Sequence, residues 1–311
     1  MIVKLTNVKK TYNNGVKALN GLSFEVREGE IFGLLGPNGS GKTTSINCLL
    51  SLLKYDEGTI EIFGEPMHPE RYDLKAQIGI VPQNVAVFEE LTVYENIDYF
   101  CGLYVKDKHK RKELVEEAID FVQLNDYRKF YPRKLSGGLL RRLNIACGIA
   151  HKPKLIIFDE PTVGVDPQSR NKILEGIQQL NTQGATIIYT SHYMEEVEQL
   201  CDFISIMDKG QVIQYGSPEE LKASVHFGET LEIKLIEPKE GHLHLVRKLP
   251  HVTDCYYEED KLIIKSKKGQ SVIPDVLKLL NDHNIQYGQL YSAMPTLNDV
   301  FLTITGKDLR D

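Results

Sequence analysis

The segment GPNGSGKT, residues 36–43, combines glycines and a lysine in a pattern suited to holding a polyphosphate. Its spacing fits G-x-x-x-x-G-K-[ST]. Triphosphate oxygens need several converging backbone N–H groups, and glycine lets the main chain approach them closely. Lys42 would place a positive charge beside the β- and γ-phosphates, and Thr43 would offer its hydroxyl to Mg²⁺. The candidate nucleotide contacts are Gly36, Pro37, Asn38, Gly39, Ser40, Gly41, Lys42, Thr43 and Thr44.

Two adjacent carboxylates end a second apolar run, LIIFDE at residues 155–160. A buried strand that ends in acidic residues can deliver them to the edge of a sheet, where the phosphates would lie. Because side chains alternate along a strand, we expect Asp159 and Glu160 on opposite sides of it. We therefore assign Asp159 to the Mg²⁺ ion and Glu160 to polarising the attacking water.

A parallel sheet is needed to bring these groups together. The stretch EIFGLLG, residues 30–36, predicts a strand that runs into the glycine loop, and a helix is expected over about residues 42–53. From residue 154 onward apolar strands alternate with helices, which is typical of a parallel sheet covered on both faces. One of these helices is marked by Asp166 as its N-cap and Pro167 as its first residue.

Two further parts complete this first region. Residues 1–35 alternate apolar and polar positions, and together with GTIEIFG at residues 58–64 they predict an antiparallel unit. Residues 92–131 are expected to be helical, with Thr92 and Glu95 forming a capping box. The fold class is therefore α/β: a P-loop core with an antiparallel β subdomain and a helical subdomain.

The pattern changes near residues 224–229, where we place a domain boundary. The elements expected beyond it are strands near 231–236, 252–257, 261–265 and 285–291, a short helix after the first strand, a helix at 271–282 and a last helix from Thr296. The order βαββαβ predicts a small ferredoxin-like α+β domain. We divide the chain into a nucleotide-binding domain at 1–224, with its helical subdomain at about 84–150, and an accessory domain at 229–311. A regulatory or dimer-stabilising role and an inert stabilising cap are both open for the accessory domain.

Composition narrows the class of protein. A chain of 311 residues that is 41% hydrophobic can bury a core, and its net charge of −6 argues against a nucleic-acid binder. Residues 219–311 also carry more acidic than basic side chains. No apolar run reaches the roughly 18 residues that a membrane-spanning helix needs. The five scattered cysteines form no CxxC pair and fit reduced thiols in the cytoplasm.

The segment LSGGLLRRLNIA, residues 135–146, resembles the signature of the ABC ATP-binding subunits. The family's other marks follow in the expected order over about residues 2–220. The resemblance implies that Tyr12 stacks on adenine and that Gln83 contributes to hydrolysis and to the metal shell. TVGVDP at residues 162–167 resembles the family's D-loop, and His192 its switch histidine. The implied cofactors are ATP and Mg²⁺.

The signature implies a partner subunit. Ser136, Gly137 and Gly138 would begin a helix and offer a hydroxyl, backbone N–H groups and a positive helix end. In the family these residues bind the γ-phosphate of ATP held by the other subunit, and the resemblance adds Asp166 to the nucleotide contacts. Because this chain has one cassette, the resemblance implies a second ATP-binding subunit, either a copy or a close paralogue.

Two positions depart from the common signature. Leu139 stands where the family usually has a glutamine, and it cannot hydrogen-bond a ribose. Arg141 also replaces a frequent glutamine. The form SGG-x-x-RRL and the C-terminal stretch TLNDVFLTITGKDLRD resemble the ABC-2 subfamily of single-cassette subunits, which serve drug, lipid or antibiotic exporters.

The function implied is an ATP-hydrolysing subunit that powers a membrane-embedded exporter. It would be cytoplasmic and would sit at the inner face of the cell membrane through a separate transmembrane permease. The cassette motifs leave an importer subunit open as an alternative. Soluble ABC ATPases are a further alternative, but those of DNA repair split their cassette with a long coiled coil, and translation-type proteins carry two cassettes in one chain.

Overall fold

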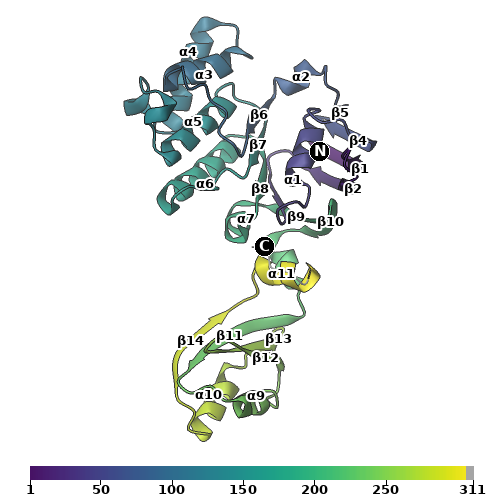
Figure 1. Cartoon of the computed structure of the whole chain (residues 1–311), viewed down its shortest axis with the longest axis vertical. Coiled ribbons are helices and arrows are strands. Elements are labelled where there is room, and N and C mark those ends of the chain that lie inside the picture. Colours follow the sequence, from purple (N-terminus) through teal and green to yellow (C-terminus); the bar gives the residue numbers. More distant parts are fainter. Residues whose placement is uncertain (306–311) are drawn as a thin grey trace. The chain divides into compact units, whose positions relative to one another are not determined.

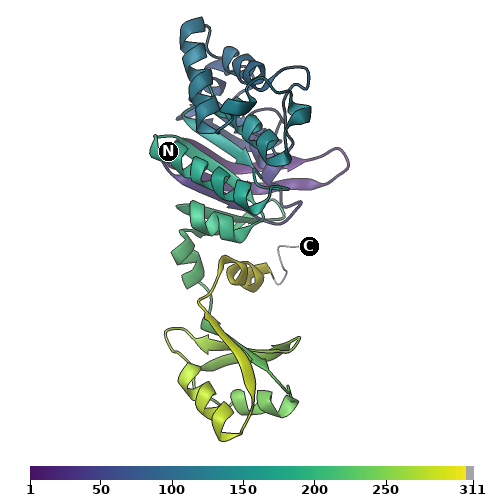
Figure 2. The ribbon, with the colours of Figure 1, turned by 90° about the vertical axis from the view of Figure 1, so that its left-hand side faces the viewer.

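Two compact units make up the chain (Figures 1 and 2). The structure is a computed structural model that describes residues 1–305. The core unit comprises Met1–Pro218, and the accessory unit begins at Glu219. Residues 306–311, the last part of the C-terminal stretch that resembles the ABC-2 subfamily, lie outside the described residues.

A six-stranded sheet forms the centre of the core unit, with the order β10-β9-β3-β8-β7-β6. All neighbouring pairs are parallel except β10 with β9 at one edge. The inner strand β7 is buried at every position, as expected for a sheet covered on both faces. The strands are β3 (Ile31–Leu35), β6 (Ile78–Val81), β7 (Leu155–Asp159), β8 (Thr186–Ser191), β9 (Phe203–Asp208) and β10 (Gln211–Gly216).

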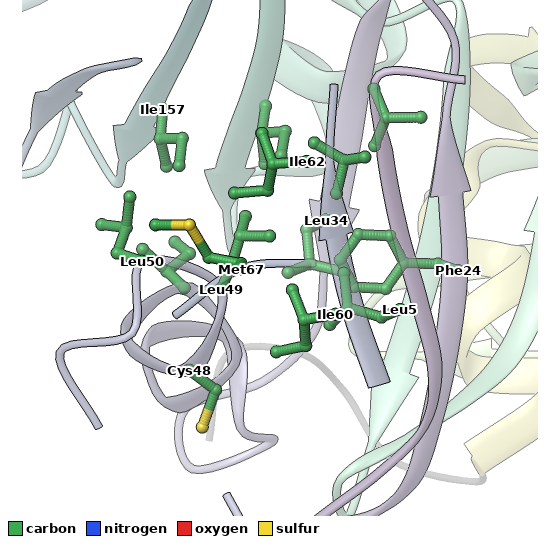
Figure 3. Packing of buried hydrophobic residues seen from close by; sticks show 14 of the residues in the cluster. Leu5, Phe24, Leu34, Cys48, Leu49, Leu50, Ile60, Ile62, Met67 and Ile157 are labelled. Carbon is green, nitrogen blue, oxygen red and sulfur yellow. The ribbon is translucent and has the colours of Figure 1, made fainter. Parts of the chain in front are cut away.

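An antiparallel sheet of order β2-β1-β4-β5 packs against this centre. Its apolar side chains, including Leu5, Phe24 and Ile60, share a buried cluster with Leu34 of β3 and Leu49 of α1 (Figure 3). This shared core fixes the loop between β3 and α1 to both sheets. The elements are β1 (Val3–Thr11), β2 (Lys17–Val26), α1 (Lys42–Leu49), β4 (Glu57–Ile62), β5 (Glu65–Pro66) and α2 (Tyr72–Lys75).

Helix α1 is shorter than the sequence predicted. It ends at Leu49, whereas the expected helix continued to residue 53. Ser51 has a left-handed backbone with φ of +52°, and the N–H of Leu52 donates back to the carbonyl of Asn47 at 2.8 Å. A left-handed residue that closes the last turn is a common helix end.

Helices fill the segment between β6 and β7. They are α3 (Val93–Gly102), α4 (Lys108–Phe121) and α5 (Gly137–Ile149), with 3₁₀ turns at Asn125–Tyr127 and Pro132–Lys134. The predicted capping box of Thr92 and Glu95 is confirmed at the start of α3. The helical character predicted for residues 92–131 is divided between two helices, because Asp107 caps a second one. Two more helices follow β7 and β8, α6 (Pro167–Thr182) and α7 (Met194–Leu200), and Asp166 caps α6 as predicted.

The accessory unit has the predicted βαββαβ order. Its sheet is antiparallel with the order β12-β13-β11-β14, and α9 and α10 cover one face (Figures 1 and 2). The last strand begins at Tyr287 rather than 285, because Asn284 adopts a left-handed turn after α10. The elements are α8 (Pro218–Ala223), β11 (Phe227–Leu235), α9 (Glu240–Val246), β12 (Val252–Glu258), β13 (Lys261–Lys267), α10 (Ile273–Asp282), β14 (Tyr287–Ala293) and α11 (Leu297–Thr305). Among residues 1–305, no helix is both long and apolar enough to cross a bilayer.

Candidate active site

The loop between β3 and α1 has a backbone that only glycine fits at two positions. A Cβ at Gly36 would lie 2.5 Å from the carbonyl oxygen of Met207 and 2.7 Å from Oγ of Ser40. Gly41 has φ of +107°, and a Cβ there would lie 2.5 Å from the carbonyl oxygen of Ala18. The Oγ of Ser40 is buried and has no hydrogen-bond partner. A glycine-lined turn with an unsatisfied hydroxyl suits a ligand rich in oxygens, as phosphate groups are.

Lys42 lies inside this loop. Its Nζ donates to the carbonyls of Gly36 at 2.7 Å and Pro37 at 3.2 Å, and it lies 3.4 Å from Oε1 of Glu160. Burial lowers the pKa of Lys42, and Glu160 opposes that change. A buried ammonium group with a carboxylate partner is available to a phosphate oxygen. The remaining loop residues differ in exposure: Asn38, Gly39 and Thr43 are exposed, while Thr44 is half-buried.

The end of β7 delivers Asp159 to the first turn of α1. Its carboxylate accepts from Oγ1 of Thr43 at 3.2 Å and from Oγ1 of Thr190 at 2.7 Å. A carboxylate next to a hydroxyl, both at a phosphate-binding loop, is the oxygen donor set that Mg²⁺ prefers. These residues therefore fit the ion assigned to them. A bound Mg²⁺ would neutralise charge on the phosphate oxygens.

Strand alternation does not determine where the side chain of Glu160 points. The strand ends at Asp159, and Glu160 turns into a left-handed conformation with φ of +48°. Its carboxylate faces three of the predicted site residues. It accepts from Nε2 of Gln83 at 3.2 Å, lies 3.4 Å from Nζ of Lys42 and lies 3.3 Å from Nδ1 of His192. The expectation of opposite sides was therefore wrong, and the left-handed turn places both carboxylates beside the loop.

Tyr12 lies at the end of the β1 segment, next to the same helix. Its hydroxyl is 3.1 Å from Oγ1 of Thr44, and its side chain is 39% exposed. An exposed ring tied to the first turn of α1 can support a flat base beside the phosphates.

Ser136, Gly137, Gly138 and Asp166 form a second group. Ser136 caps α5, with the N–H of Leu139 donating to its Oγ at 3.4 Å. A Cβ at Gly138 would lie 3.5 Å from Oδ2 of Asp166, so the two predicted segments meet. No hydrogen bond or ion pair within residues 1–305 joins this group to the loop at 36–41.

Three polar groups at the site were missed from the sequence. The hydroxyl of Thr190 donates a hydrogen bond to the carboxylate of Asp159. Thr190 lies near the end of β8, two residues before His192. Arg141, noted only as a departure, hydrogen-bonds the carbonyls of Gln83 and Glu160. Glu196 is buried next to the strand that carries Ser191. A charged residue in a largely apolar helix was the available signal for Arg141, whereas Glu196 lies among other glutamates and had no such signal.

Comparisons with known proteins identify relatives of this chain. The family model described as ABC transporter matches residues 19–163. The Linearmycin resistance ATP-binding protein LnrL of Bacillus subtilis is 40% identical, with 100% of both chains covered. The Nod factor export ATP-binding protein I of Sinorhizobium fredii is 35% identical over 99% of this chain and 87% of its own. A solved dimeric, post-hydrolysis state of the ATP-binding cassette MJ0796 bound to ADP and Pi is 28% identical with a TM-score of 0.64, covering 69% of this chain and 98% of that one.

Proposed function

This chain belongs to the ABC transporter family, and from that membership we propose that it is the ATP-hydrolysing subunit of a membrane-embedded exporter. It binds nucleotide and hydrolyses ATP, as cassettes of this family do. The relatives named for antibiotic resistance and for Nod factor export favour an exporter over an importer. The cargo is a drug, an antibiotic or a lipid-like molecule, and a separate permease carries it across the membrane.

The observation that carries the enzymatic role is the convergence on Glu160. Its carboxylate faces a cation, an amide and an imidazole, from Lys42, Gln83 and His192. Lys42 would bind the β- and γ-phosphates, and Thr43 with Asp159 would hold a Mg²⁺ ion that neutralises phosphate charge. Glu160 accepts a proton from the attacking water, while Gln83 and His192 fix the orientation of the Glu160 carboxylate.

A second copy of the cassette, or a close paralogue, completes the site. Within residues 1–305 no hydrogen bond or ion pair joins the signature residues at 136–138 to the phosphate loop, although their helix N-terminus suits an anion. The dimeric state of the solved cassette supports a head-to-tail pair. Each ATP is then held between the loop of one subunit and the signature of the other.

The surface from Gln83 to Tyr104 contacts the permease. Phe88 is 42% exposed, and its ring lies 4.9 Å from that of Tyr99 and 5.8 Å from that of Phe100. Exposed aromatic groups of this kind mark interaction sites. Because Gln83 also contacts Glu160, this surface is linked to the site of hydrolysis.

The test is Glu160→Gln, which keeps the size of the side chain but removes its basic oxygen. The variant is expected to bind ATP, to lose nearly all turnover and to elute as an ATP-bound dimer in size-exclusion chromatography. Glu28→Gln, at an exposed position, is the matched control and should hydrolyse normally. A Glu160→Gln protein that stays monomeric with ATP and turns over normally would overturn the assignment.

A further inference from the structure

Positive charge is concentrated at the start of α4. We call residues 106–112 the basic segment, and its sequence is KDKHKRK. All its lysines are exposed: Lys106, Lys108, Lys110 and Lys112. The whole chain has a net charge of −6, so the segment is opposite in sign to the molecule that carries it.

Helix stability does not explain this arrangement. The N-terminal end of a helix favours acidic side chains, and the C-terminal end favours basic ones. The first turn of α4 has no acidic residue after the N-cap Asp107, and its last turn has no basic residue. The second half of the helix holds three of its four acidic side chains: Glu116, Glu117 and Asp120. Apart from the N-cap Asp107, charge in α4 therefore opposes the helix dipole at both ends.

The acidic half of α4 is tied to the rest of the core unit. Glu116 forms an ion pair with Arg128 at 2.5 Å, and Glu117 forms one with Lys152. These contacts give the acidic side chains a structural role. The reversed charge in this half is thus explained by partners within the fold.

The basic segment is mostly without such partners. Arg111 pairs with Asp98 at 2.8 Å, and Lys110 lies 3.6 Å from Glu113. The other three cations have no ion pair or side-chain hydrogen bond within residues 1–305: Lys106, Lys108 and Lys112. Lys108 lies in the first turn of α4, where positive charge is unfavourable, and none of the three lysines gains an internal contact, which indicates an external partner with negative charge.

Exposed apolar side chains lie directly before the basic segment. Leu103 is 57% exposed and Tyr104 is 43% exposed, and both lie between the end of α3 and the basic segment. Lysines beside an exposed tyrosine and leucine form a typical surface for lipid headgroups, because the ring and the alkyl groups enter the interface while the cations meet phosphates. A nucleic acid or an acidic peptide would use the charge but not the apolar groups.

We propose that the basic segment binds the anionic headgroups of the lipid bilayer in which the permease lies. This inference rests on the proposed function, which places the subunit at a membrane. It is also continuous with the proposed permease surface, which ends at Tyr104. The attraction is electrostatic, so it weakens as ionic strength rises.

The test is flotation of the full chain with vesicles. The wild type should bind vesicles that contain phosphatidylglycerol and should not bind vesicles of phosphatidylcholine alone. The triple variant Lys106→Gln, Lys108→Gln, Lys112→Gln should bind the anionic vesicles roughly 100-fold more weakly. Its melting temperature should be equal to or above that of the wild type, because the lost charges oppose the helix dipole.

A control removes three exposed lysines from the accessory unit and should bind vesicles as the wild type does: Lys248→Gln, Lys267→Gln and Lys278→Gln. Equal vesicle binding by the two triple variants would overturn the proposal. If the Lys106, Lys108, Lys112 variant keeps vesicle binding but loses affinity for detergent-solubilised permease, the partner is a protein and the lipid assignment is wrong. ATP binding measured without vesicles tests the proposed function separately.

Discussion

Arg141 donates from Nη2 to the main-chain carbonyl of Glu160 at 2.6 Å and from Nη1 to that of Gln83 at 2.8 Å. It also donates to the carbonyls of Pro161 and Pro82. The side chain is 3% exposed, and burial lowers the pKa of its guanidinium. One side chain of the signature helix α5 thus holds the backbone on both sides of the contact between Gln83 and Glu160.

We predict that Arg141→Gln lowers kcat by about 100-fold, because a small displacement of a catalytic group is enough for such a loss. The ATP dissociation constant should stay near that of the wild type, since no hydrogen bond or ion pair within residues 1–305 joins Arg141 to the phosphate loop. Steady-state ATPase assays and titration calorimetry measure the two quantities.

The neighbouring Arg142 provides the control. Its Nη1 donates to the carbonyl of Val122 at 3.0 Å, away from the site, so Arg142→Gln removes the same charge without touching Glu160. We expect its kcat to remain close to that of the wild type. Equal losses of kcat in both variants would show that Arg141 has no specific positioning role.

Lys42→Ala is expected to weaken ATP binding itself by at least about tenfold, because a hydrogen bond to a charged group contributes roughly 1.5–3 kcal/mol. Titration calorimetry measures the effect. Lys54→Ala, at an exposed position beyond α1, should leave the affinity unchanged. Unchanged affinity in Lys42→Ala would contradict the placement of the phosphates at this loop.

Local features of the site could be predicted because their signals are short in sequence. The glycine loop follows a strand and opens α1, and the caps at Thr92 and Asp166 form through contacts within three residues. Strand β7, which ends at Asp159, could also be predicted, because a continuous apolar run is typical of a strand covered on both faces. The βαββαβ order of the accessory unit was likewise readable from alternating patterns.

Contacts with the main chain could not be predicted in this way. The partners of Arg141 are carbonyls, which every residue has, and they lie far from it in sequence. The left-handed turn at Glu160 also leaves no compositional sign, because glutamate rarely adopts it. Alternation was therefore the wrong guide to that side chain. The site depends on tertiary packing that residue types alone do not encode.

Glu196 joins two of the predicted segments. Its Oε2 accepts from Thr162 at 2.7 Å, from Tyr189 at 2.7 Å and from Ser191 at 3.3 Å, and its Oε1 lies 3.2 Å from Nε of Arg170. The side chain is buried, whereas Arg170 is partly exposed. Each of these four neighbours presents a hydrogen-bond donor or a positive charge to the carboxylate.

We predict that Glu196→Gln lowers the free energy of unfolding by about 1–3 kcal/mol, since an amide N–H₂ would face donors and leave them unsatisfied. Urea denaturation without nucleotide measures this. Glu195→Gln, at the exposed neighbouring position, should change stability by less than about 0.5 kcal/mol. A loss in Glu196→Gln no larger than in Glu195→Gln would show that the network contributes nothing to the fold.

Leu139 lies in the first turn of α5, at the signature position that commonly carries glutamine. Its N–H donates to Oγ of Ser136, while its side chain is half-buried rather than part of the core. Leu143, one turn further along, is fully buried. The side chain of Leu139 is thus close to the surface that would meet the ATP of the other subunit.

We predict that Leu139→Gln tightens ATP-driven dimerisation without changing the ATP affinity of the monomer, because the contact exists only between subunits. A glutamine would add one or two hydrogen bonds to the ribose, each contributing about 0.5–1.5 kcal/mol. Sedimentation with ATP, in the hydrolysis-deficient Glu160→Gln background, measures the dimer. The melting temperature of the nucleotide-free monomer should not change, since a half-exposed amide can reach water. A clear drop in that temperature would mean that Leu139 packs inward with Leu143 and that the amide is buried without a partner.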